Sequence, residues 1–154
     1  MAAITIPTQP NAAVGRFPVL RVGAVATLAG AAATELFGLA ARVAGIPMRA
    51  ADPGAHAAKY IPVGGLFMAV VMNAALGILL AAALFRWSRR PARAFALGAL
   101  VYTALSELAP FFAAHTETAT KVVLVVAHVI AAAMIIPPLT ARLSAGAHGR
   151  EARL

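Results

Sequence analysis

The sequence predicts an all-α membrane protein, a four-helix transmembrane bundle with up-down-up-down connections and both termini in the cytoplasm. Three observations lead to this prediction. Of the 154 residues, 62% are hydrophobic and 12% are charged, and the mean hydropathy is +0.85, which leaves too little polar surface for a soluble domain. Four apolar runs approach the roughly 20 residues that a helix needs to cross a bilayer. The basic residues gather at the ends of these runs.

The helices are expected in chain order with short polar connections between them. Residues 1–18 are rich in proline and are expected to form a disordered tail. The transmembrane domain is expected at residues 19–143, followed by a basic tail at residues 144–154. Its spans are predicted at residues 19–44, 63–85, 94–114 and 122–139, the last ending at Pro137 and Pro138.

The first run has a competing interpretation, because basic residues precede an apolar region that contains small residues. This pattern is shared with cleaved signal peptides. The run is long for a signal, which favours a retained helix.

The distribution of Lys and Arg orients the predicted chain. Cytoplasmic loops of membrane proteins carry an excess of these residues. One side of the predicted bundle holds Arg16, Arg21, Arg86, Arg89, Arg90, Arg93, Arg142, Arg150 and Arg153. The other side holds Arg42, Arg49, Lys59 and Lys121. We therefore expect the first side, with both termini, to face the cytoplasm. We expect the protein to lie in the cell membrane.

The same placement excludes nucleic acid as the partner, although the net charge is +8. A nucleic-acid-binding protein carries its basic residues along one polar face, and here they lie at helix ends. The chain has no cysteine, which excludes disulfides, thiolate metal sites and thiol redox chemistry.

Four polar side chains lie deep within the predicted spans: Glu35, Asn73, Glu107 and His128. Counting about 1.5 Å per residue along each helix places them roughly 9 to 15 Å from the outer ends of their spans. They would then share one layer in the outer half of the membrane. Such residues within a membrane are costly and are commonly functional.

Two carboxylates in one layer would repel each other, so one should hold a proton or both should share a cation. A protonated Glu107 would be a general acid, with His128 or Glu35 as its partner in catalysis. A set of two Glu and one His can also bind a divalent metal, but these spacings match no metal motif. We expect no cofactor.

The third run adds a polar stripe. Thr103, Ser106, Glu107 and Pro110 share one helical face by their spacing. Pro110 cannot donate to the carbonyl of Ser106, which leaves that acceptor free. Candidate ligand-binding residues are Asn73, Ser106, Thr103 and Thr34.

Each of these residues also has a structural interpretation. Glu35 would pair with Arg42, two turns further along the helix. Asn73 would hydrogen-bond between helices, and His128 would be a packed imidazole. For Glu107 alone, the neighbouring Ser106 and Pro110 favour a functional role over a structural one.

The whole pattern resembles an uncharacterised actinobacterial family of small four-span integral membrane proteins. The features that carry the resemblance are "LAARVAGIPMR", "IPVGG", "RRPAR", the Ser-Glu-x-x-Pro arrangement at residues 106–110, and "AHVIAAAMIIPPL". It covers roughly residues 20 to 143 by pattern. The resemblance implies an integral membrane location in a high-GC bacterium and implies no activity.

Three functions are compatible with the sequence. The leading one is a polar intramembrane site that binds, or converts by acid–base chemistry, a lipid-like or isoprenoid ligand. The second is a non-catalytic accessory or assembly subunit of a larger membrane complex. The third is proton-coupled transport of a small solute by a homodimer. The sequence alone does not decide whether the protein is an enzyme.

Overall fold

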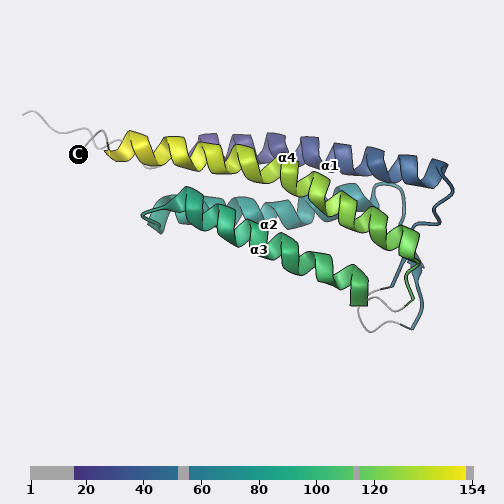
Figure 1. Cartoon of the computed structure of the whole chain (residues 1–154). Coiled ribbons are helices and arrows are strands. Elements are labelled where there is room, and N and C mark those ends of the chain that lie inside the picture. Colours follow the sequence, from purple (N-terminus) through teal and green to yellow (C-terminus); the bar gives the residue numbers. More distant parts are fainter. Residues whose placement is uncertain (1–15, 52–55, 113–114, 152–154) are drawn as a thin grey trace, which may run out of the picture.

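The computed structural model describes residues 16–51, 56–112 and 115–151, and within them the chain forms four helices and one two-stranded sheet (Figure 1). The fold is therefore all-α in class, as predicted. The elements are α1 (Arg16–Val43), β1 (Arg49–Ala50), β2 (Lys59–Tyr60), α2 (Gly65–Trp87), α3 (Pro91–Phe112) and α4 (Thr118–Glu151).

The four helices lie roughly along one direction, with consecutive helices running in opposite senses (Figure 1). The α2–α3 connection and the last turns of α4 lie at one end, called here the turn end. The β1–β2 hairpin and the start of α4 lie at the other, the hairpin end. α1 packs extensively on α4 and α2, and α3 packs on α4. The α2–α3 contact is much smaller, and α3 diverges from α2 toward the hairpin end (Figure 1).

Three of the described helical segments are long and apolar enough to cross a membrane: Pro18–Val43, Gly65–Trp87 and Thr118–Gly146. They indicate a membrane location. α3 is not among them, and it carries Arg93, Ser106 and Glu107 within its 22 residues.

The end of α1 is set by Gly45, which has a φ of 85°. Ile46 N–H donates to the Ala41 carbonyl at 3.0 Å and Gly45 N–H to the Arg42 carbonyl at 2.9 Å. This pair of bonds is a Schellman motif, which needs a residue in the left-handed region. The chain then enters the antiparallel β1–β2 hairpin, in which Arg49 faces Tyr60. The sequence indicated only a polar connection here, because strands of two residues leave no alternation to detect.

The core is concentrated at the two ends. At the turn end, Val19, Ala81, Phe95, Leu139 and Leu143 form one buried cluster. At the hairpin end, Ala41, Met48, Leu66 and Val123 form another. The buried residues between the clusters are small, such as Ala74 and Ala127. The helices are therefore held firmly at both ends and are less completely filled in the middle.

The prediction that the fourth helix ends at Pro137 and Pro138 is wrong, because α4 continues through both prolines to Glu151. Residues 144–151 of the expected tail are helical, and so are residues 16–18 of the expected N-terminal tail. The remainder of the two tails, residues 1–15 and 152–154, lies outside the described residues. Leu139 and Leu143, just beyond the prolines, are fully buried against α1, α2 and α3. That packing holds the helix where the prolines remove two backbone donors.

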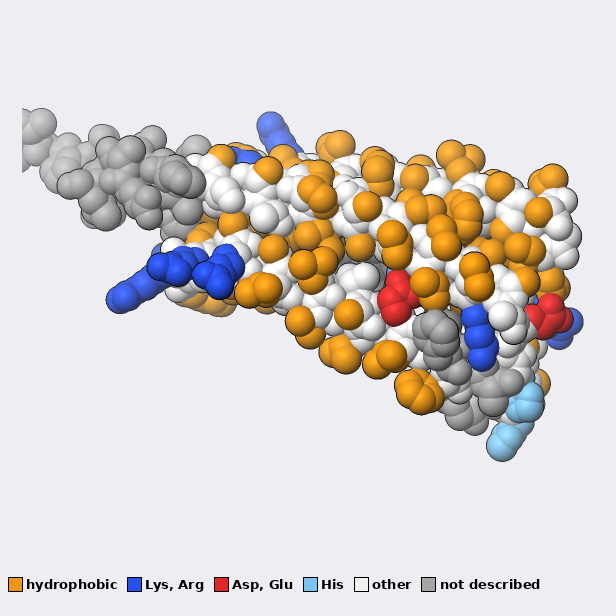
Figure 2. Space-filling model, viewed as in Figure 1, with side chains coloured by type: hydrophobic (Ala, Val, Ile, Leu, Met, Phe, Trp, Pro, Cys, Tyr) orange, Lys and Arg blue, Asp and Glu red, His pale blue; other side chains and the backbone are white. Residues whose placement is uncertain are grey.

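The outer surface is rich in apolar side chains, which fits a membrane location. Many large hydrophobic side chains are exposed, among them Leu76, Leu79, Val101 and Leu105. Figure 2 shows hydrophobic side chains spread over the middle of this face, with most Lys and Arg side chains toward its two ends.

The space around individual glycines shows where the helices are closely packed and where they are not. A Cβ placed on Gly30 of α1 would lie 3.3 Å from Ile135 Cγ1 and from Met134 Cβ of α4. A Cβ on Gly77 of α2 would meet nothing within 4 Å. The α1–α4 interface is thus closely packed at Gly30, as small residues allow in membrane helices, and the surface of α2 beside Gly77 is open.

This difference predicts opposite results for the same substitution. Gly30→Val should lower the free energy of unfolding by about 1–3 kcal/mol, because its methyl groups must push α4 away. Gly77→Val, the matched control, should leave stability unchanged or slightly raised. Thermal unfolding of both purified variants in one detergent measures this. Equal loss in both would contradict the close α1–α4 contact.

Candidate functional site

A cavity of about 450 Å³ lies between α2, α3 and α4, with one residue of α1, Thr34, also reaching it. Its walls are mostly apolar. The polar residues that line it are Thr34, Asn73, Tyr102, Thr103, Ser106 and His128. Toward the turn end the lining is apolar, with Leu80, Phe95 and Ile136. A mostly apolar cavity of this size with a few convergent polar groups is typical of a small-molecule site.

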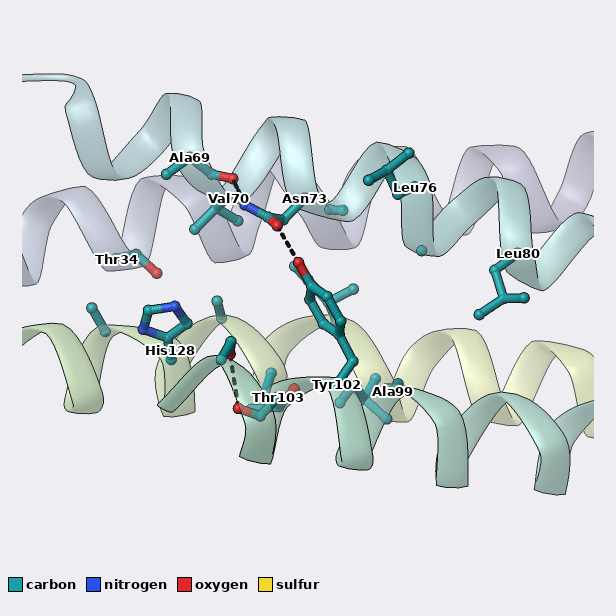
Figure 3. A pocket seen from close by; sticks show the side chains of 18 of the residues that line it. Thr34, Ala69, Val70, Asn73, Leu76, Leu80, Ala99, Tyr102, Thr103 and His128 are labelled. Carbon is teal, nitrogen blue, oxygen red and sulfur yellow. Dashed lines mark hydrogen bonds between the residues drawn. The ribbon is translucent and has the colours of Figure 1, made fainter. Parts of the chain in front are cut away.

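Asn73 and Tyr102 connect α2 to α3 across this cavity (Figure 3). The Tyr102 hydroxyl donates to Asn73 Oδ1 at 2.5 Å, and Asn73 Nδ2 donates to the Ala69 carbonyl at 2.8 Å. Both side chains are exposed on the outer surface as well. They therefore sit where the cavity meets the surroundings, at the sparse α2–α3 contact.

His128 enters the cavity from α4. Its Nδ1 lies 2.8 Å from the Leu124 carbonyl oxygen of the preceding turn. A carbonyl can only accept, so Nδ1 carries the proton of this hydrogen bond. In the neutral ring, Nε2 is then left as an acceptor.

Two hydroxyl residues of α3, Thr103 and Ser106, line the same part of the cavity. Ser106 Oγ donates to the Thr103 carbonyl at 2.8 Å. Thr34 differs from them, because its side chain is 1% exposed and its Oγ1 has no hydrogen-bond partner among the described residues. A buried hydroxyl without a partner is costly in a folded protein.

Glu35 lies outside the cavity and holds the start of α2. Its Oε1 accepts from Gly64 N–H at 2.8 Å, and its Oε2 accepts from Phe67 N–H at 3.1 Å. Free N–H groups at a helix start favour a negative charge. Glu35 thus caps α2 from a different helix.

Arg42 completes this arrangement from the same face of α1. Its Nη1 lies 3.6 Å from Glu35 Oε1, and its Nη2 donates to the Ile61 and Pro62 carbonyls at 3.0 and 3.1 Å. Glu35 takes the N–H groups of the segment that leads into α2, and Arg42 takes its carbonyls. The Glu35–Arg42 pairing that the sequence left open is therefore present.

Glu107 also lies outside the described lining of the cavity. Both of its carboxylate oxygens are buried and have no hydrogen-bond partner among the described residues. It lies within electrostatic range of His128. α3 continues past it through Pro110 to Phe112, and the Pro110 side chain lies outside the described part of the chain.

Five of the predicted site residues thus share one cavity: Thr34, Asn73, Thr103, Ser106 and His128. Glu35 and Glu107 do not line it. No group of three or more His, Asp and Glu residues within the described ranges is placed to hold a metal ion. Tyr102 was missed by the sequence reasoning. It precedes Ser106 by one turn and stands beside Thr103, so the helical spacing that identified this polar stripe could have included it.

These features define a class: an all-helical protein with three helices able to cross a membrane and a mostly apolar cavity that contains a few polar groups. The chain belongs to a family of unknown function (DUF6069), whose sequence profile matches residues 15–145. This confirms the resemblance to an uncharacterised family. No curated protein matches the chain, and no solved structure does.

The different surroundings of the two glutamates predict different effects of the same change. Glu35→Gln should lower the free energy of unfolding by about 1–3 kcal/mol, because the neutral amide has one acceptor atom for two N–H groups. Glu107→Gln should leave stability within about 0.5 kcal/mol of wild type or raise it, because no hydrogen bond from the described residues to Glu107 is lost.

Thermal unfolding in detergent at neutral pH measures both variants, with Glu117→Gln at an exposed position as the control. A Glu107→Gln protein that unfolds as readily as Glu35→Gln would contradict this distinction.

Proposed function

We propose that this protein is an integral membrane protein with four membrane-spanning helices that binds a lipid-like ligand in the cavity between α2, α3 and α4. The observation that carries the proposal is the gradation of the cavity lining. The polar groups lie in its middle and toward the hairpin end, among apolar side chains such as Val70 and Leu124, and the lining toward the turn end is apolar throughout (Figure 3). An amphiphile with an apolar tail and a small polar head fits such a lining.

The topology follows from the order of the helices. α2 ends at the turn end and α4 begins at the hairpin end (Figure 1). If both cross the membrane, α3 must carry the chain back across it. Its 22 residues extend about 33 Å as a helix, enough for a hydrocarbon layer of about 30 Å. α3 is then the fourth span of an up-down-up-down bundle.

The proposed orientation places the turn end in the cytoplasm. Arg86, Arg89, Arg90 and Arg93 surround the α2–α3 connection there. The positive-inside rule then puts both termini on the same side. We place the protein in the cell membrane of an actinobacterium, in line with the resemblance noted above.

The sparse α2–α3 contact supports entry of the ligand from the bilayer. Gly77 of α2 and Gly98 of α3 both line the cavity, and an added Cβ at either would meet nothing within 4 Å. Only the Asn73–Tyr102 hydrogen bond joins α2 and α3 among the side-chain bonds of the described residues. The proposal is for binding and includes no acid–base step, since neither glutamate lines the cavity. The catalytic roles expected for Glu107, His128 and Glu35 stay predictions from the sequence.

The absence of cysteine allows a direct test of topology. Single cysteines replace His56 and Glu117, which are exposed at the hairpin end, and Arg89, which is exposed at the turn end. We expect a membrane-impermeant maleimide to label His56→Cys and Glu117→Cys in intact cells, and Arg89→Cys only after permeabilisation. Labelling of Arg89→Cys and Glu117→Cys from the same side would rule out α3 as a span.

The binding function is tested with radiolabelled 1-dodecanol and purified protein in detergent. Gly77→Leu combined with Gly98→Leu fills open space in the cavity wall, and we expect it to weaken saturable binding about tenfold or more. The matched control combines Ala75→Leu with Ala104→Leu, exposed positions of the same helices that do not line the cavity. It should bind as wild type does. Undiminished binding to the filled variant would overturn the proposal.

A further inference from the structure

Two polar groups on different helices have unused hydrogen-bonding capacity among the described residues that line the cavity. Thr34 of α1 and His128 of α4 enter the same part of the cavity, on the hairpin-end side of Asn73 (Figure 3). Thr34 Oγ1 is buried and has no partner among the described residues. His128 Nδ1 bonds to the Leu124 carbonyl, which leaves Nε2 of the neutral ring as an acceptor. One donor and one acceptor are thus available side by side.

The lining also limits the charge of the ligand. None of the described residues that line the cavity is Lys, Arg, Asp or Glu. An anionic head such as a phosphate or carboxylate would therefore meet no Lys or Arg among these residues, and an ammonium would meet no carboxylate. Burial of an unpaired charge is strongly unfavourable.

We propose that the head group recognised here is a neutral alcohol, and that Thr34 and His128 bind it. This inference rests on the binding function proposed above and names its ligand class, an alcohol with an apolar tail. The ligand hydroxyl donates to His128 Nε2 and accepts from the Thr34 hydroxyl. A ketone or ester could accept from Thr34 but could not donate to His128, and a hydrocarbon could do neither.

The tail then extends from this pair toward the turn end. His128 and Ile136 both line the cavity and lie two helical turns apart on α4, about 12 Å. Leu80 and Phe95 close the same apolar part from α2 and α3. The hydroxyl therefore marks the hairpin-end side of the site, and the tail lies against residues that offer no polar contact.

The test is competition for radiolabelled 1-dodecanol at neutral pH by compounds with the same tail: unlabelled 1-dodecanol, dodecane, dodecanoate and dodecyl phosphate. In wild type the alcohol should compete about tenfold or more better than the other three. Thr34→Val, which is nearly isosteric, should reduce this preference about three- to tenfold, as the loss of one hydrogen bond does. His128→Phe should do the same.

The matched control is Thr27→Val. Thr27 lies two turns from Thr34 on α1, is also buried, and does not line the cavity. Its hydroxyl likewise has no hydrogen-bond partner among the described residues. This variant should keep the full preference for the alcohol. If Thr34→Val and Thr27→Val behave alike, the assignment of Thr34 is wrong. The Thr34→Val result stands by itself if His128→Phe does not fold.

The outcomes separate this inference from the function on which it rests. Equal competition by dodecane and 1-dodecanol, with binding still lost in the variant filled at Gly77 and Gly98, would overturn the head-group assignment and leave the binding function intact. Preferential competition by dodecanoate or dodecyl phosphate would overturn the neutral head group. If the variant filled at Gly77 and Gly98 binds 1-dodecanol as well as wild type does, both the binding function and the head-group assignment are wrong.

Discussion

The rest of the structure depends on how the backbone N–H and C=O groups at the start of α2 find hydrogen-bond partners without water. Helix starts leave N–H groups free, and the chain before them carries free carbonyls, which are costly in an apolar layer. Glu35 accepts two of these N–H groups and Arg42 donates to two of these carbonyls. Both belong to α1, so the polar needs of α2 are met by its neighbour. These bonds fix the position of α2 along α1. They therefore also fix the positions of the α2 residues that line the cavity.

The cavity itself follows from where small residues lie. On α1, Gly30 and Gly38 allow α4 and α2 to approach closely, since a Cβ there would contact Ile135 or Leu66. On α2 and α3, Gly77 and Gly98 have open space beside them. The same residue type thus closes one interface and leaves another unfilled. Bulky residues gather instead in the two end clusters. Because those clusters hold the helices apart at both ends, the middle cannot collapse to fill the space.

Much of this could be predicted from composition and spacing, and the failures have physical causes. Apolar length located all four helices to within a few residues, but not the continuation of α4, because the burial of Leu139 and Leu143 outweighs the local effect of two prolines. The site residues Thr34, Asn73, Thr103, Ser106 and His128 were identified because polar residues are conspicuous in apolar runs. Glu35 follows Thr34 directly on α1, so its depth is close to that of the cavity, but its carboxylate accepts from the backbone at the start of α2 and does not line the cavity. Counting depth along a helix does not tell which way a side chain points.

The separation of charge from the cavity is what favours binding over the other functions. A carrier of protons needs a titrating group open to its pathway, and the described residues that line the cavity include no Asp or Glu. Glu35 is fully engaged with α2 and Arg42, so it serves the fold. The groups left in the cavity are neutral, and most are already bonded to one another or to backbone. Thr34 and His128 keep unused capacity at the point where α1 and α4, the most closely packed helices, come together. A site formed between rigid helices holds its polar groups in fixed positions, which suits recognition of a small head group.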